Sequence, residues 1–154
     1  MAGRIEERLE ELGIVIPETP APAGSYVPFV ATGNLLFISG QISIQGDTRY
    51  VGKIGVEYSV EDGQQAARIC ALNILAQLRA ACDGDLDRVV RCVRLGGFVN
   101  STPEFTDQPK VINGASDLLA EVFGESGKHS RAAVSAASLP LGVAVEIDAI
   151  FEIA

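Results

Sequence analysis

The spacing of apolar residues changes several times along the chain, and each change predicts a different element. Residues 4–12 place Ile5, Leu9 and Leu12 on one stripe among acidic residues, which predicts a short amphipathic helix. Residues 14–28 hold four of the seven prolines. Because proline lacks a backbone N–H and disfavours the helical conformation in the residue before it, this segment is predicted to be an extended arm.

Strand-type and helix-type patterns alternate in the rest of the chain. Residues 30–54 carry apolar runs interrupted by glycine-containing turns, which predicts two or three antiparallel strands. The spacing of Ser59 and Asp62 predicts a capping box at the start of a helix of about six turns. Pro109 suits the first turn of a second helix, which Gly124 would end.

Three further strand-like segments complete the pattern, at residues 88–99, 131–137 and 143–153, with the last two joined at "SLPLG". The resulting order, ββ(β)αβαββ, predicts an α+β fold in which a single mixed or antiparallel sheet carries two helices on one face. An open doubly wound sheet is the alternative. This alternative is disfavoured, because the chain has no glycine-rich phosphate loop after any strand and a terminal hairpin fits a doubly wound sheet poorly.

The predicted terminal hairpin would place two charged side chains on one face of the sheet. In residues 143–153 the apolar positions alternate with polar ones, and Glu146 belongs to the polar set. If the chain reverses at residues 140–141, Arg131 and Glu146 share a face about 13 Å apart, which leaves room for a small ligand. An arginine suits a planar carboxylate because its fork donates two parallel hydrogen bonds. Alternatively, Arg131 pairs with an acid across a subunit contact and Glu146 is solvated.

Composition and charge narrow the classes of protein. A chain of 154 residues with 47% hydrophobic residues is most simply one globular domain. A net charge of −8 disfavours a nucleic-acid partner, because neutralising phosphates needs clustered Lys and Arg. No apolar run approaches the roughly 18 residues that span a bilayer, and the N-terminus is charged throughout. We therefore expect a cytoplasmic protein that binds a small metabolite, with no membrane partner.

Cysteine and histidine are scarce. Cys70, Cys82 and Cys92 are an odd number and form no CxxC pair, so we expect reduced core thiols, with a catalytic thiol as the alternative. His129 is the single histidine, which disfavours a zinc site and histidine-dependent triads. We expect no metal site.

Three stretches of the chain resemble one family of proteins. They are "GNLLFISGQIS", "NGASDLLAEVFGE" and "SRAAVSAASLPLGVAVEIDAI". Over about residues 24–151 the chain resembles the RidA superfamily (YjgF, or L-PSP endoribonuclease-like), the reactive intermediate deaminases, as a longer branch with an N-terminal helical extension. The resemblance implies a chorismate-mutase-like fold for residues 24–154, preceded by a helix and arm at residues 1–23. It also implies a homotrimer with ligand clefts between subunits, and neither cofactor nor metal.

The resemblance also implies an activity and a set of site residues. Family members hydrolyse imines and enamines such as 2-aminoacrylate to 2-oxo acids and ammonia. Arg131 falls on the family's carboxylate-binding arginine, and Glu146 on the glutamate that positions the attacking water. The other implied substrate-binding residues are Tyr26, Ser39, Gly40, Asn113 and Ala133. The substrate would be a small metabolite that bears a carboxylate.

Some residues depart from the family pattern and keep other functions open. Ala133 stands where the family commonly has Cys or Thr, and "KHSRAA" replaces the usual Pro-Ala-Arg approach. These departures motivate the alternative of a non-catalytic trimer that binds small carboxylates or another protein. An endoribonuclease, which the family's older name suggests, is disfavoured by the net charge of −8 and the single histidine.

Structural roles are also open for the individual residues. Tyr26 could anchor the arm, and Ser39 with Gly40 could form an ordinary strand-end turn. Asn113 could be solvated and His129 a loop residue. On the other side, Asp148 lies on the same predicted face as Glu146 and could replace it as the base.

Overall fold

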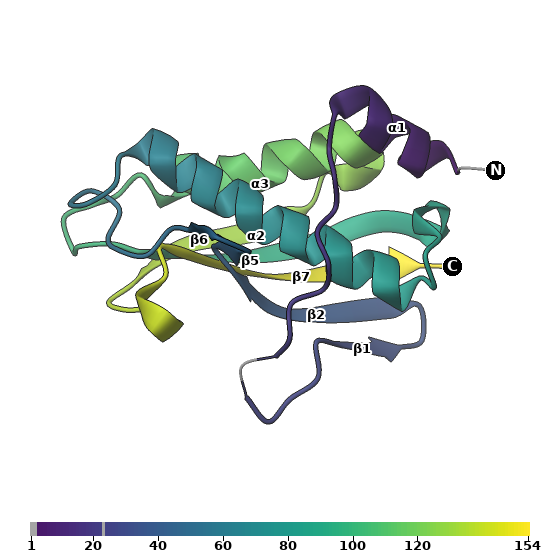
Figure 1. Cartoon of the computed structure of the whole chain (residues 1–154), viewed down its shortest axis with the longest axis horizontal. Helices are drawn as coiled ribbons and strands as arrows, with labels where there is room; N and C mark the ends of the chain where they lie inside the picture. Colours follow the sequence, from purple (N-terminus) through teal and green to yellow (C-terminus); the bar gives the residue numbers. More distant parts are fainter. Residues whose placement is uncertain (1–2, 23) are drawn as a thin grey trace.

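A five-stranded sheet and two long helices packed on one of its faces form the framework of the protein (Figure 1). The computed structural model describes residues 3–22 and 24–154. The helices are α1 (Arg4–Leu12), α2 (Val60–Ala81) and α3 (Gln108–Phe123), with short 3-10 turns η1 (Leu86–Arg88), η2 (Gly124–Gly127) and η3 (Pro140–Gly142). The strands are β1 (Phe29–Thr32), β2 (Leu35–Ile42), β3 (Ile44–Gln45), β4 (Thr48–Arg49), β5 (Val89–Asn100), β6 (Ser130–Ala136) and β7 (Val145–Ile153).

The strand order in the main sheet is β1-β2-β7-β5-β6, and β3 and β4 form a separate two-stranded ribbon. All pairs in the main sheet are antiparallel except β5 with β6, which is parallel. The predicted α+β fold with a mixed sheet and both helices on one face is therefore confirmed (Figure 1). The predicted capping box is also confirmed, since Ser59 and the carboxylate of Asp62 each accept a hydrogen bond from the other's backbone N–H.

The predicted hairpin between the last two strands is wrong. β6 pairs with β5, and β7 lies between β2 and β5. The reason is the connection through α3: a crossover helix joins parallel neighbours, so β6 returns beside β5 and takes the free edge. The chain then passes β5 through η3 and enters the centre of the sheet as β7.

Glycines allow the two long helices and the sheet to pack closely. A Cβ on Gly114 of α3 would overlap the backbone of Gln64 in α2, so only glycine lets the helices approach this closely. A Cβ on Gly97 of β5 would lie 2.7 Å from the side chain of Ile112 in α3. These contacts set the position of α3 over β5 and β6, where Arg131 lies.

The N-terminal helix packs against the domain. Ile5 and Leu9 of α1 belong to the same buried cluster as the residues between sheet and helices, and so do Ile14 and Ile16 of the arm. The carboxylate of Asp87 caps α1 by accepting hydrogen bonds from the backbone N–H groups of Arg4 and Ile5, both at 2.9 Å. The division of the chain into residues 1–23 and 24–154 stays a prediction, although α1 and the domain share one core. Among residues 3–22 and 24–154, no helix combines the length and the apolar character needed to cross a bilayer.

We predict that Asp87→Ala lowers the free energy of unfolding by about 1 kcal/mol at neutral pH, the usual cost of losing a helix cap. The hydrogen bonds from the N–H groups of Ile5 and Arg4 hold the pKa of Asp87 below its usual value. The stabilisation is therefore present above the unfolded-state pKa and is lost as the pH falls through the folded-state pKa. Urea unfolding at several pH values measures both effects. Asp47→Ala, in the exposed turn between β3 and β4, is the control, and an equal loss in both variants would contradict the capping role.

Candidate functional site

Arg131 and Glu146 lie on opposite faces of the sheet, so the prediction that they share a face is wrong. Arg131 pairs with Leu95, which pairs with Ala149, and both of these partners are buried under the helices. Glu146 pairs with Phe98, which is 37% exposed on the face without helices. Cross-strand neighbours point to the same side of a sheet. The error arose because the predicted hairpin paired β6 directly with β7. In the structure β5 lies between these two strands, so they have no direct register.

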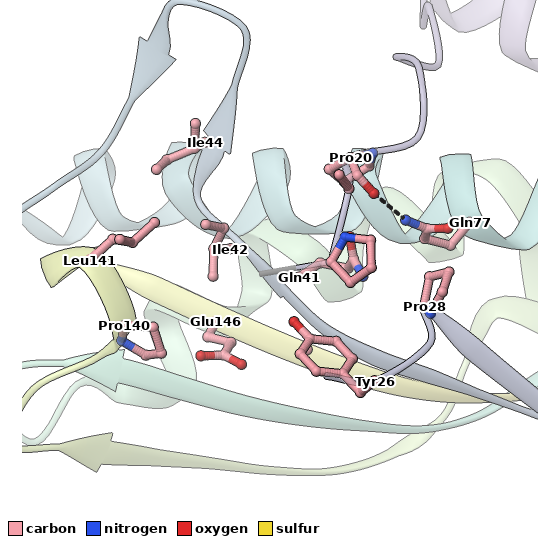
Figure 2. Close-up of a pocket in the computed structure, with 13 residues that line it drawn as sticks. Pro20, Tyr26, Pro28, Gln41, Ile42, Ile44, Gln77, Pro140, Leu141 and Glu146 are labelled. Atoms are coloured by element: carbon pink, nitrogen blue, oxygen red, sulfur yellow. Dashed lines mark hydrogen bonds between the residues drawn. The ribbon is translucent and has the colours of Figure 1, made fainter. Parts of the chain in front are cut away.

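Glu146 projects into a cavity of about 320 Å³ at the start of β7 (Figure 2). Its walls come from the arm, from β2 and from the turn before β7. The lining residues are Pro20, Ala21, Pro22, Tyr26, Pro28, Gly40, Gln41, Ile42, Ile44, Gln77, Pro140, Leu141 and Glu146. Burial in these largely apolar surroundings raises the pKa of Glu146, and the nearby charge of Asp148 raises it further. Such a carboxyl can exchange a proton closer to neutral pH than an exposed glutamate can.

Gly40 makes room for the Glu146 carboxylate. The pairing of β2 with β7 shifts register between Ile38 and Gln41, so the strand bulges beside Glu146. A Cβ on Gly40 would overlap the Oε2 atom of Glu146, and the bulged glycine therefore fixes where this carboxylate can lie. A larger residue at position 40 would therefore displace the Glu146 carboxylate.

Ser39 supports the site without lining the cavity. Its hydroxyl donates a hydrogen bond to the carbonyl oxygen of Val27 at 2.8 Å, and its backbone N–H donates to that of Pro28 at 2.9 Å. These bonds attach the end of the arm to β2 just after Tyr26, and Tyr26 borders the cavity (Figure 2). Asp148, the alternative base, borders a different hollow together with Arg94.

Arg131 lies in a second hollow, between β6 and α3. Its Nη1 donates to the hydroxyl of Ser116 at 2.9 Å, and its Nη2 donates to the carbonyl oxygen of Pro109 at 3.1 Å. Asn113 of the same chain lines this hollow. Ala133 follows Arg131 on the same face of β6, is half-buried, and packs against the core.

His129 and Ser116 orient the guanidinium of Arg131. The Nδ1 atom of His129 lies 2.6 Å from the carbonyl oxygen of Gly127, which can only accept, so Nδ1 carries the proton. Nε2 then accepts from the hydroxyl of Ser116 at 2.9 Å, which leaves the Ser116 oxygen to accept from Arg131. Neither Ser116 nor a supporting role for His129 was predicted. The spacing of Ser116 and Asn113, three residues apart on one helix, was the available signal.

The predicted site residues form two groups within one protomer. Tyr26, Gly40 and Glu146 meet at the first cavity, and Arg131 and Asn113 meet at the second hollow. No described pocket contains both Arg131 and Glu146. The predicted site residues that line these two hollows therefore lie on opposite faces of the sheet.

All three cysteines are reduced and buried, as predicted. Burial raises the pKa of Cys70, with Glu146 as a smaller cause, and raises the pKa of Cys92 to about 12. Burial also raises the pKa of Cys82. A buried neutral thiol is a poor nucleophile, so the structure disfavours the catalytic-thiol alternative.

We predict that the native structure keeps His129 neutral below pH 6.5. Burial lowers the pKa of His129, the hydrogen bond to Gly127 opposes this, and the charge of Arg131 lowers it further. The unfolded chain takes up the proton first as the pH falls, so stability is full above 6.5 and declines as the pH falls toward the folded-state pKa. His129 is the only histidine, so its imidazole signal in an NMR titration reports this pKa directly. His129→Gln is expected to remove this decline in urea unfolding. A measured pKa above 6.5 would contradict the proposed hydrogen-bond directions.

Comparisons with known proteins identify the family. The family described as "YjgF/chorismate_mutase-like, putative endoribonuclease" matches residues 6–152. Protein TCP17 of Trypanosoma cruzi is 49% identical over 155 residues, which cover 99% of this chain and 96% of that protein. The crystal structure of Atu1372 from Agrobacterium tumefaciens, a protein of unknown function, is 51% identical with a TM-score of 0.90, and the match covers 97% of this chain and 92% of that one.

A more distant relative carries the family's other name. The crystal structure of RidA from an Antarctic Psychrobacter is 27% identical with a TM-score of 0.61, and the match covers 88% of this chain and 94% of that one. Both the sequence match and the fold agree with the resemblance drawn from the three sequence stretches. The chain therefore belongs to the YjgF/RidA superfamily and has its chorismate-mutase-like α+β fold.

Proposed function

We propose that the protein is an imine and enamine deaminase that converts small imino acids to 2-oxo acids and ammonia. The observation that carries the proposal is the half-buried Glu146, which projects into a largely apolar cavity and whose pKa is raised by burial. Family membership and the position of Arg131 support it. A carboxyl group in such surroundings suits proton transfer to and from a bound substrate.

The proposed reaction needs few protein groups. Water adds to the imine carbon, the C–N bond breaks, and the oxygen of the water becomes the 2-oxo oxygen while the nitrogen leaves as ammonia. Glu146 takes one proton from the attacking water and passes it to the imine nitrogen as the C–O bond forms. As the C–N bond breaks, the second proton moves from the new hydroxyl group to the leaving nitrogen, again through Glu146, so both protons of the water end on ammonia. The step involves no redox change and no covalent bond to the protein, so it relies on positioning and proton transfer.

In this proposal Arg131 holds the substrate carboxylate. The hydrogen bonds to Ser116 and Pro109 fix the guanidinium from the side of α3. Because Arg131 and Glu146 belong to different faces of one sheet, we propose that each complete site lies between two subunits. The partner of Glu146 would then be Arg131 of the adjoining chain.

The face of the sheet without helices supports a homotrimer. Large apolar side chains on it are exposed, including Val30 at 53%, Phe37 at 41% and Val134 at 46%. Apolar patches of this kind on a sheet commonly mark contacts between subunits. A closed ring of three chains, as the family resemblance implies, would bury this face and bring both halves of the site together.

We predict that the wild-type protein removes imines that an amino-acid oxidase generates in the presence of semicarbazide, and so lowers the yield of trapped semicarbazone. Glu146→Gln is expected to lower kcat roughly 100-fold, because it removes the proton-transfer group. Arg131→Ala is expected to lower kcat/KM roughly 10- to 100-fold, because the carboxylate loses a charged partner. Arg49→Ala, on the exposed strand β4, is the control and should behave like the wild type.

Equal trapping with and without wild-type protein, over a panel of imines, would refute the deaminase proposal. Binding of 2-oxo acids in the absence of turnover would instead favour the alternative, a non-catalytic trimer that binds small carboxylates. Cleavage of RNA by the wild type and not by Glu146→Gln would favour an endoribonuclease, which the net charge of −8 disfavours.

Subunit mixing tests where the two halves meet. Arg131→Ala and Glu146→Gln are each expected, as pure proteins, to keep at most the small residual activity predicted above. If each site takes one residue from each of two neighbours, randomly reassembled trimers should regain about a quarter of the wild-type activity, because each mixed ring has one intact site. Mixed and pure samples are compared after denaturation and joint refolding. No recovery in rings shown to contain both variants would place both residues in the same subunit's site.

A further inference from the structure

We propose that the proline-rich arm is a specificity-determining wall, which makes the Glu146 cavity selective for imino acids with apolar side chains of leucine size or larger. We define the arm wall as Pro20, Ala21, Pro22, Tyr26 and Pro28. This inference rests on the proposed deaminase function and concerns the part of the substrate that Arg131 and Glu146 do not hold.

The lining of the cavity suits an apolar group. Figure 2 shows Pro140 and Leu141 at one end, Pro28 and Gln77 at the other, and Glu146 between them. Among the described residues that line the cavity, Glu146 is the one with a titratable carboxyl or amino group. Burial already disfavours its charged form, so the walls offer little to balance a charged side chain on the substrate. An aliphatic or aromatic side chain would fill the space and gain from leaving water.

The size of the cavity also exceeds what a three-carbon imino acid fills. Its volume of about 320 Å³ lies at the lower end of the range that holds drug-sized ligands. With the imine carbon near Glu146, the remaining space runs beside Ile42 and the arm wall (Figure 2). A substrate such as 2-aminoacrylate would leave this space unfilled.

The arm wall is fastened at both ends, so it can discriminate between shapes. Gln77 of α2 is 1% exposed, and its Nε2 donates a hydrogen bond to the carbonyl oxygen of Pro20 at 3.2 Å. At the other end, Ser39 of β2 donates its hydroxyl hydrogen bond to the carbonyl oxygen of Val27. Pro20 and Pro22 have fixed φ angles, which reduces the ordering that these two residues need on binding. Gln77 is thus a positioning residue for the wall.

The first experiment compares substrates and filling variants. We expect the wild-type kcat/KM for imines from leucine and phenylalanine to exceed that for the imine from alanine by at least about 10-fold, the scale of discrimination that one or two methylene groups give. Ala21→Phe should remove most of this preference by filling the cavity and leave the alanine-derived imine as a substrate. Thr19→Phe is the matched control, since it adds the same ring to the arm outside this cavity. Gln77→Ala should reduce the preference by releasing Pro20.

The second experiment does not depend on turnover. Calorimetric titration with pyruvate and with 4-methyl-2-oxopentanoate measures binding of a small and a large 2-oxo acid. We expect tighter binding of the larger acid, lost in Ala21→Phe and retained in Thr19→Phe. Circular dichroism and the midpoint of urea unfolding establish that each variant is folded.

The combined results separate the two proposals. Turnover without a size preference, or a preference that Ala21→Phe leaves intact, would overturn the arm-wall proposal and leave the deaminase proposal standing. Selective binding without turnover of any imine would refute the deaminase proposal and support the arm wall. Equal binding of both acids, or binding of neither, would overturn the arm-wall proposal whatever the turnover.

Discussion

Helices α2 and α3 bury one face of the five-stranded sheet and leave the other face without a helix. The packing depends on small residues, because Gly114 lets the helices approach each other and Gly97 lets α3 settle on β5. The placement of the candidate site residues follows from this layering. Arg131, on the helix side, is held by Ser116 and Pro109 of α3, whereas Glu146, on the other side, faces β2 and the arm.

The two faces give the two charged groups different chemical surroundings. The guanidinium of Arg131 is oriented by the hydrogen bonds that it donates to acceptors of its own protomer, and a neutral His129 keeps the Ser116 oxygen available as one of them. Glu146 lies in a space that Gly40 leaves open and that the arm lines on one side, and its partial burial raises its pKa. An anchored cation for a carboxylate and a proton-transfer group in an apolar cavity are the components that the proposed imine hydrolysis uses. Their separation within one chain is the physical reason why we propose that the complete site lies between subunits.

The arm adds a feature that composition alone suggested only as an extended segment. Gln77 and Ser39 turn the prolines into a fixed wall, and the apolar residues Ile14 and Ile16 secure the approach to it. The N-terminal helix, capped by Asp87 from the turn before β5, holds the start of the arm in place. The additional N-terminal residues therefore connect the core to the cavity that contains Glu146.

Local sequence determined the helices and strands, because the signals for them lie within each element. These signals are the apolar stripe in α1, the Ser59–Asp62 capping box of α2, Pro109 at the start of α3 and the alternation in β7. Three short sequence stretches, one of which contains Arg131 and Glu146, also indicated the family and the candidate site residues. The sequence pattern did not predict the order of the strands. That order depends on the pairing of β6 with the outer edge of β5 after the chain returns through α3, which is a contact between residues distant in the sequence. Because β6 was predicted to pair with β7 instead of β5, Arg131 was assigned to the same face of the sheet as Glu146, whereas it lies on the opposite face. Only the tertiary structure decided that Ser116 and His129 orient Arg131, that Gly40 makes room for Glu146 and that the arm lines one side of the Glu146 cavity, because each is a contact between elements that no local pattern specifies.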